Sequence, residues 1–129
     1  MSNYSELLSR AKEAQQNAYC PLSNQPVGAA LLSDDGEIFT GCNIEYACYG
    51  GSVCAESVAL LKALSEGKRK FKALAISNGS FPCGACRQFV SEFGIDVDIV
   101  LPSSGSPFRS VKLRDLLPHN FGPEDIAKV

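Results

Sequence analysis

Two short cysteine motifs contain the residues of this sequence best suited to chemistry. The first is Cys54-Ala55-Glu56, and the second is Pro82-Cys83-Gly84-Ala85-Cys86. Each falls at the predicted start of a helix, where free backbone N–H groups and the positive end of the helix dipole favour thiolate over thiol. Three thiolates from two neighbouring helix starts can bind one tetrahedral zinc ion and leave its fourth position open, as catalytic zinc sites require. The spacing therefore predicts a zinc site made by Cys54, Cys83 and Cys86.

Glu56 lies two residues after the first cysteine, on the first turn of the same predicted helix. It is poorly placed to bind the same ion, but it can reach water at the open position. Zinc lowers the pKa of a bound water to about 7, and a neighbouring carboxylate can accept its proton and pass it to a leaving group. A C-x-x-C pair alone also fits a redox pair or half of a structural zinc site. A carboxylate that is not a ligand has no purpose in a structural site, so the two motifs together favour catalysis.

The composition restricts the classes of protein that remain. The chain has 129 residues, of which 45% are apolar and 20% charged, and this predicts a single domain over residues 1–129. A net charge of -2 argues against nucleic acid as a partner, because phosphate neutralisation needs a basic face. No segment approaches the ~18 continuous apolar residues of a membrane helix. Six cysteines without a visible export signal predict reduced thiols and a cytoplasmic location.

The elements that position the two motifs alternate between helices and strands. Apolar residues recur with helical spacing over 4–18 and 53–66, and further helices are predicted over 82–93 and 113–117. Apolar runs predict strands over 27–32, 37–42, 71–77 and 97–101, with Asp34-Asp35-Gly36 as the turn between the first two. This order predicts an α/β domain in which helices pack on the faces of a mixed sheet.

The sequence resembles the small homotetrameric zinc-dependent cytidine deaminases, which are related to the blasticidin S deaminases, over nearly its whole length. The resemblance rests on five matching stretches: Val27-Gly28-Ala29-Ala30-Leu31, Gly41-Cys42-Asn43-Ile44-Glu45, Cys54-Ala55-Glu56, Pro82-Cys83-Gly84-Ala85-Cys86-Arg87-Gln88, and Leu116-Leu117-Pro118 with Phe121-Gly122-Pro123. It implies a three-layer fold, one zinc ion per subunit, and hydrolysis of cytidine and deoxycytidine to the uracil nucleosides with release of ammonia. It also implies a homotetramer whose subunits share their active sites.

The resemblance assigns roles to individual residues. It implies that Cys54, Cys83 and Cys86 bind zinc and that Glu56 shuttles protons. The remaining roles concern the nucleoside: Asn43 and Glu45 hold the sugar hydroxyls, the N–H of Ala55 binds the pyrimidine carbonyl, the C=O of Phe81 accepts from the leaving amino group, and Tyr49 and Phe121 reach a neighbouring site across subunit contacts. Taken alone, Asn43 and Glu45 also fit a loop cap, and the two aromatic residues fit ordinary packing.

Three departures from the family pattern surround the predicted site. Gln25 stands where the family has an aromatic wall residue, and Ser57 stands where it has an arginine that hydrogen-bonds a thiolate. Arg87 and the helix starts remain to offset the charge of three thiolates, so a poorer Lewis acid is expected. The loop over 76–81 is short. These changes leave open a deaminase of modified cytosine nucleosides, either N4-substituted or resembling blasticidin S, and, in a different class, an inactive structural zinc module. Cys20, Cys42 and Cys48 are expected to be free thiols.

Overall fold

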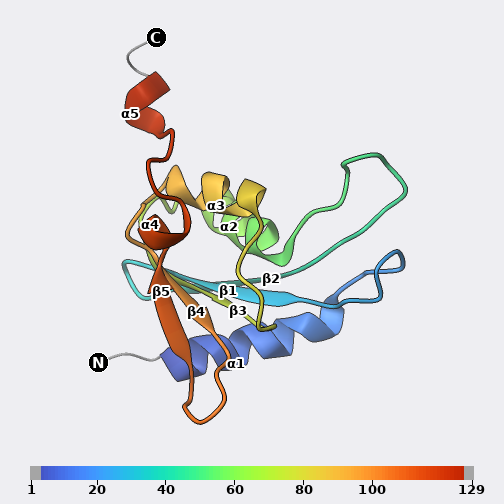
Figure 1. Cartoon of the computed structure of the whole chain (residues 1–129). Helices are drawn as coiled ribbons and strands as arrows, with labels where there is room; N and C mark the ends of the chain where they lie inside the picture. The colour runs from blue at the N-terminus through green and yellow to red at the C-terminus, as the bar shows by residue number, and fades with distance from the viewer. Residues whose placement is uncertain (1–3, 127–129) are drawn as a thin grey trace.

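A single mixed sheet forms the middle layer of the computed structural model, which describes residues 4–126 (Figure 1). Its strands are β1 (Gly28–Ser33), β2 (Ile38–Cys42), β3 (Phe71–Ile76), β4 (Asp98–Leu101) and β5 (Arg109–Lys112), and they lie in the order β2-β1-β3-β4-β5. Only the β3–β4 pair is parallel. Because parallel neighbours need a crossover connection, the chain passes over one face of the sheet between β3 and β4, and this connection contains the second cysteine motif.

Helices cover both faces of the sheet and complete three layers. Helix α1 (Tyr4–Ala14), followed by the 3-10 turn η1 (Gln15–Asn17), lies on one face, whereas α2 (Ala55–Ser65) and α3 (Gly84–Ser91) lie side by side on the other (Figure 1). Two short helices, α4 (Leu113–Leu116) and α5 (Pro123–Ile126), end the described chain. The α/β class and the layered mixed sheet expected from the sequence are thus confirmed.

Alternation along the strands divides the core between the two faces. Leu31, Leu74 and Ile99 point toward α2 and α3, and they are fully buried there. Their neighbours in the chain face α1 and are mostly small, as the buried cluster of Ala30, Ala73, Ala75 and Val100 shows. Successive side chains of a strand point to opposite faces, so one apolar run supplies both cores. The small residues let α1 pack close to the sheet.

Two glycines allow the helices to cross the sheet closely. A Cβ atom at Gly28 would collide with the carbonyl oxygen of Ala11 in α1. On the other face, a Cβ at Gly41 would lie 2.6 Å from both the carbonyl oxygen of Ala55 and the backbone nitrogen of Ala59. Gly41 therefore fixes how deeply the start of α2 seats on β2, and the start of α2 holds the first cysteine motif.

Each predicted element is found within two residues of its predicted bounds, except that the first helix is shorter, and one strand was not predicted. The first helix was expected over 4–18, but α1 ends at Ala14 and the chain tightens into η1, with Ala18 already extended. Strand β5 was not predicted, because Val111 is the one apolar residue among Arg109–Lys112 and the strand lies exposed at the edge of the sheet. No helix among residues 4–126 is both long enough and apolar enough to cross a membrane.

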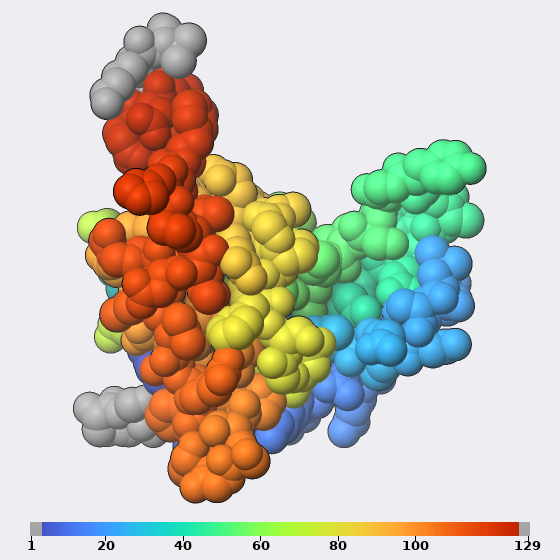
Figure 2. Space-filling model, viewed as in Figure 1, coloured from blue at the N-terminus to red at the C-terminus, as the bar shows by residue number. Residues whose placement is uncertain are grey.

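Two parts of the chain stand away from these layers. One is the excursion over residues 43–53 between β2 and α2, and the other is the segment that ends in α5 (Figures 1 and 2). Both carry large apolar side chains at the surface, with Tyr49 fully exposed and Phe121 56% exposed. Apolar side chains this exposed contribute nothing to the core of the single chain.

Candidate active site

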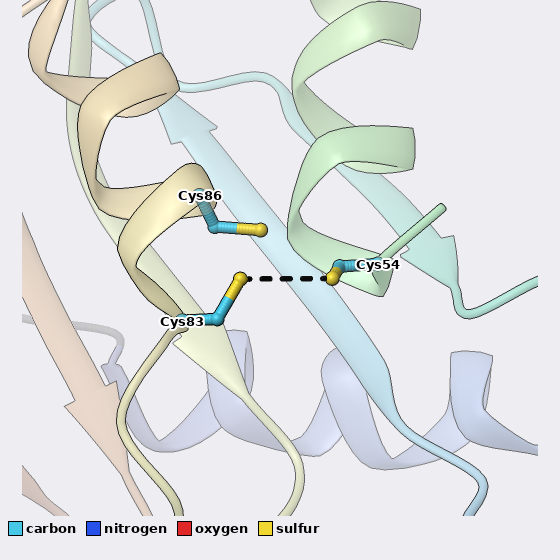
Figure 3. A group of neighbouring side chains, drawn as sticks. All are labelled: Cys54, Cys83 and Cys86. Atoms are coloured by element: carbon cyan, nitrogen blue, oxygen red, sulfur yellow. Dashed lines mark hydrogen bonds between the residues drawn. The ribbon is translucent and has the colours of Figure 1, made fainter. Parts of the chain in front are cut away.

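The sulfur atoms of the two cysteine motifs converge at the neighbouring starts of α2 and α3 (Figure 3). The Sγ atoms of Cys54, Cys83 and Cys86 all lie within 4.8 Å of one another, and those of Cys54 and Cys83 are 3.9 Å apart. Two thiolates on one tetrahedral zinc ion are separated by about 3.8 Å, because each Zn–S bond is about 2.3 Å long. The three sulfur atoms therefore have the spacing of a set of ligands around one ion.

The local backbone explains why the sulfur atoms point inward. Cys54 and Cys83 are the N-cap residues of α2 and α3, both with extended backbone, and their carbonyl oxygens accept the first helical bonds from Val58 and Arg87. Neither side chain makes the usual cap hydrogen bond to its own helix. Each sulfur is therefore free to face the other helix, and Cys86 follows one turn later on the same side of α3.

The surroundings affect the ionisation of the three thiols in different directions. Burial raises the pKa of Cys54 and of Cys86, whereas the backbone N–H of Cys86 lowers the pKa of Cys83. A divalent ion between the sulfur atoms favours the thiolate form of all three and offsets the cost of burying their charge. The donor set therefore fits zinc, whose preferred ligands include thiolates in tetrahedral geometry.

Ser57 was expected to leave the thiolates without a side-chain donor and Arg87 to offset their charge, but the contacts of the two residues are the reverse. The Ser57 hydroxyl lies 3.5 Å from the Sγ atom of Cys86, within hydrogen-bonding distance for sulfur. Arg87 instead donates from Nε to the carbonyl of Pro82 at 2.7 Å and from a terminal nitrogen to the carbonyl of Leu116 at 2.8 Å. Within residues 4–126, Arg87 has no hydrogen bond to a thiol, so the Ser57 hydroxyl, and not the Arg87 guanidinium, lies within hydrogen-bonding distance of the sulfur cluster.

Glu56 lies beside the thiols and is only 6% exposed. Its side chain lines a cavity of about 150 Å³ together with Cys54, Ala55 and Cys83. Burial raises the pKa of the Glu56 carboxyl group. A carboxyl group with a raised pKa exchanges protons more readily near neutral pH, which is the property required of a general acid and base.

Asn43 reaches the cavity, whereas Glu45 does not line it. The Asn43 amide accepts from the N–H of Val27 at 2.9 Å and donates to the carbonyl of Gln25 at 2.9 Å. The Glu45 carboxylate accepts from the N–H groups of Leu22 and Ser23, each at 3.0 Å, and from the Ser23 hydroxyl at 2.6 Å. These bonds lower the pKa of Glu45, chiefly through the Ser23 hydroxyl. Both residues therefore tie the segment before β1 to the segment after β2.

Of the other predicted substrate contacts, some line the cavity and others lie outside it. Ala55 and Phe81 line the cavity, so the structure brings them together with Glu56 and the cysteines. Gln25 is exposed and does not line the cavity, and Val27 is the residue of this segment that does. Tyr49 and Phe121 project from the two outlying segments and do not reach the cavity of their own chain.

Four further residues line the cavity and were not predicted as site residues: Val27, Ile76, Asn78 and Ser80. Asn78 and Ser80 lie in the connection between β3 and the second cysteine motif, which the sequence indicated only as a short loop over 76–81. Their position in the sequence could have identified them as site residues. Polar residues that directly follow a buried strand and precede a metal-binding motif lie at the same sheet edge as the ligands.

Known proteins share both this arrangement and the sequence that makes it. Residues 1–101 match the family described as the cytidine and deoxycytidylate deaminase zinc-binding region. A cytidine deaminase of Sporosarcina psychrophila is 42% identical over 127 residues, which cover 95% of this chain and 93% of that protein. The crystal structure of a cytidine deaminase from Burkholderia pseudomallei superposes with a TM-score of 0.84 at 42% identity, covering 94% of this chain and all of the other.

A cytidine deaminase from Mycobacterium tuberculosis gives a similar result, with a TM-score of 0.82 at 38% identity over 95% of this chain and 99% of that one. The likeness therefore extends over the sheet, both helical layers and the two motifs at the helix starts. On this evidence the chain belongs to the zinc-binding family of cytidine and deoxycytidylate deaminases.

Proposed function

We propose that this protein hydrolyses cytidine and deoxycytidine to uridine and deoxyuridine with release of ammonia. The observation that carries the proposal is the buried Glu56, which lines one cavity together with the converging thiols of Cys54 and Cys83. A structural metal site has no use for such a carboxylate. The relatives named as cytidine deaminases support the same reaction, since they match nearly the whole chain.

Cys54, Cys83 and Cys86 hold one zinc ion per chain in this proposal. A zinc ion held by these three thiolates would supply a Lewis acid that makes water nucleophilic near neutral pH. The hydroxyl of Ser57, 3.5 Å from the Cys86 sulfur, stabilises the thiolate as a hydrogen-bond donor.

Glu56 moves the protons. As base, its carboxylate takes a proton from the attacking water, and as acid it gives this proton to ring nitrogen N3. The oxygen of the water bonds to C4 of the base. Glu56 then transfers the second proton of the water to the amino nitrogen while the bond from C4 to that nitrogen breaks and N3 keeps its proton. One water is consumed, one ammonia leaves, and the carboxylate is regenerated.

The groups that line the cavity provide the contacts with the base. The N–H of Ala55, at the start of α2, binds the pyrimidine carbonyl, and the C=O of Phe81 accepts from the leaving amino group. Asn43 and Glu45 receive the sugar hydroxyls. The Glu45 carboxylate accepts three hydrogen bonds from residues 22 and 23, which leaves part of its acceptor capacity for a hydroxyl.

A homotetramer with shared active sites completes the pocket. The cavity of about 150 Å³ is smaller than the roughly 300–1,000 Å³ typical of ligand pockets, so one chain encloses only part of a nucleoside. Tyr49 and Phe121 are exposed on the two segments that stand away from the layers. A second copy of the chain would bury these apolar side chains and supply the missing walls.

A cytoplasmic location is consistent with the cysteines. All six are free thiols, including Cys48 at the surface and the three at the proposed zinc site. Thiols stay reduced in the cytosol, whereas they form disulfides in the oxidising compartments of the secretory pathway.

A substrate panel with metal analysis tests the proposed function. The purified protein is incubated with cytidine, deoxycytidine, an N4-acylcytidine and blasticidin S, and the products are separated. We expect uridine and deoxyuridine from the first two and about one zinc ion per chain. Zinc without turnover of any substrate would indicate a structural zinc module. A marked preference for the larger substrates would indicate a deaminase of modified cytosine nucleosides.

A further inference from the structure

The rim of the cavity between Ser77 and Pro82 is fixed at its two ends. Ser77 donates its N–H to the carbonyl of Gly28 and accepts the N–H of Gly28 on its hydroxyl, both at 2.8 Å. At the other end Pro82 is fully buried, and its carbonyl accepts from Arg87. These bonds hold the rim to β1 and to α3, on either side of the cavity.

Between these ends the rim has few ties to the rest of the protein. Within residues 4–126, the one hydrogen bond of this segment is local and runs from the N–H of Ser80 to the side chain of Asn78 at 3.2 Å. A Cβ atom at Gly79 would meet nothing within 4 Å. Asn78, Ser80 and Phe81 nevertheless line the cavity, so a loosely held segment forms one wall of the proposed substrate site.

One side chain from the edge of the sheet contacts this wall. The guanidinium carbon of Arg109, on β5, lies 4.8 Å from the centre of the Phe81 ring. Arg109 is the first residue of β5 and pairs with Leu101 of β4, so its backbone is fixed by the sheet. The other two cations of this region, Lys112 and Arg114, are paired with Asp98 and Asp96, whereas Arg109 has no carboxylate partner within residues 4–126.

We propose that Arg109 is a positioning residue for the base-binding wall of the site. A cation over an aromatic face attracts the ring, and this restricts the side chain and backbone of Phe81 together. The carbonyl of Phe81 is the group assigned to the amino group of the base, so the edge strand sets the position of that acceptor. This inference rests on the proposed function for its effect on substrate, but not for the contact itself.

The holoenzyme tests the inference through steady-state kinetics with cytidine. Arg109→Gln keeps a long polar side chain but removes the charge. We expect its KM to rise about two- to fivefold, the effect of losing one exposed cation–π contact, with kcat and zinc content little changed. Arg109→Lys keeps a positive charge, so its KM should lie between those of the wild type and Arg109→Gln. Arg114→Gln, the matched control, removes an exposed arginine that pairs with Asp96 outside the cavity, and it keeps the wild-type KM.

A double-mutant cycle and amide hydrogen exchange make the test specific. In a Phe81→Leu background, Arg109→Gln should raise KM no further, because the ring it acts on is absent. Amide hydrogen exchange at residues 78–81 should be about two- to fivefold faster in Arg109→Gln than in the wild type, the same factor as the expected rise in KM. Unchanged exchange would overturn the contact as a restraint, whether or not the protein deaminates cytidine. Faster exchange with an unchanged KM, or equal effects of Arg109→Gln in both backgrounds, would overturn its role in positioning.

Discussion

The metal half and the sugar half of the candidate site are built in different ways. Cys54, Cys83 and Cys86 lie on the first turns of two packed helices, and their backbone is fixed by helical hydrogen bonds. Asn43 and Glu45 lie where the chain leaves the sheet for an exposed excursion, and their side chains hold neighbouring loop segments. The first half is complete within one chain, and the second is open to solvent.

This difference separates chemistry from recognition. Helix starts on a buried sheet hold reacting groups within narrow limits, as zinc binding and proton transfer require. The sugar half lies on loops at the surface, and the apolar residues nearby remain exposed. Substitutions in the metal half should therefore change zinc binding and turnover, whereas those in the sugar half should change KM and depend on neighbouring subunits.

Glu56→Gln should have the largest effect. Glutamine keeps the size of the side chain but cannot carry protons, so turnover of cytidine should fall by at least 10²–10⁴-fold while the fold and zinc content are retained. Zinc analysis and product formation on the same sample provide the measurement, with Glu66→Gln, at the exposed end of α2, as the control. If Glu56→Gln kept more than roughly a tenth of the wild-type rate, the residue would lose its assigned role.

Ser57→Ala sharpens the assignment of the metal half. Removal of the hydroxyl 3.5 Å from the Cys86 sulfur should weaken zinc binding about tenfold, because hydrogen bonds to metal ligands typically contribute at least this much. Competition with a chromophoric chelator measures the affinity directly. Ser52→Ala, in the loop before α2, is the control. Equal zinc affinities for wild type and Ser57→Ala would show that the Ser57 hydroxyl does not stabilise the thiolates and that the helix starts alone do so.

Phe121→Ala tests whether the sugar half depends on a second subunit. Its side chain is 56% exposed in the single chain, so truncation should leave the stability of the subunit nearly unchanged. In the oligomer we expect KM for cytidine to rise about tenfold through lost apolar contact. Mixed oligomers of Phe121→Ala and Glu56→Gln should regain part of the activity, because some sites then receive both native residues. An active monomer by light scattering, or mixtures that regain nothing, would contradict shared sites.

The smallest effect concerns the pH dependence of the loop that Glu45 holds. Hydrogen bonds from Ser23 and Leu22 lower the pKa of the Glu45 carboxyl group in the folded chain. Because the folded pKa is below the unfolded one, the stabilisation is present above the ordinary glutamate range and is lost as the pH falls through the lowered value. The amide resonances of Leu22 and Ser23 should shift over that acidic range, and Glu45→Gln should remove the dependence. A pH dependence that survives in Glu45→Gln would show that another group controls the loop.

The sequence allowed the metal half to be predicted far better than the loops. The Cys-Ala-Glu and Pro-Cys-Gly-Ala-Cys motifs are local patterns at helix starts, and local patterns determine which residues share a turn. Gln25 was expected in the cavity wall but lies outside it. Its position depends on contacts between residues 20–27 and 43–45, and contacts between segments this far apart in the chain leave no local pattern in the sequence. Strand β5 was missed for a related reason, since an exposed edge strand has no apolar alternation to reveal it.

The most direct test of the account is to titrate zinc and turnover together. The holoenzyme is treated with increasing amounts of a chelator, and zinc per chain and uridine formation from cytidine are measured at each step, followed by addition of zinc. The account predicts about one zinc per chain at the start, a rate that falls in proportion to bound zinc, and recovery when zinc is restored. Full cytidine turnover in protein freed of zinc, or no zinc and no turnover in the protein as purified, would contradict it.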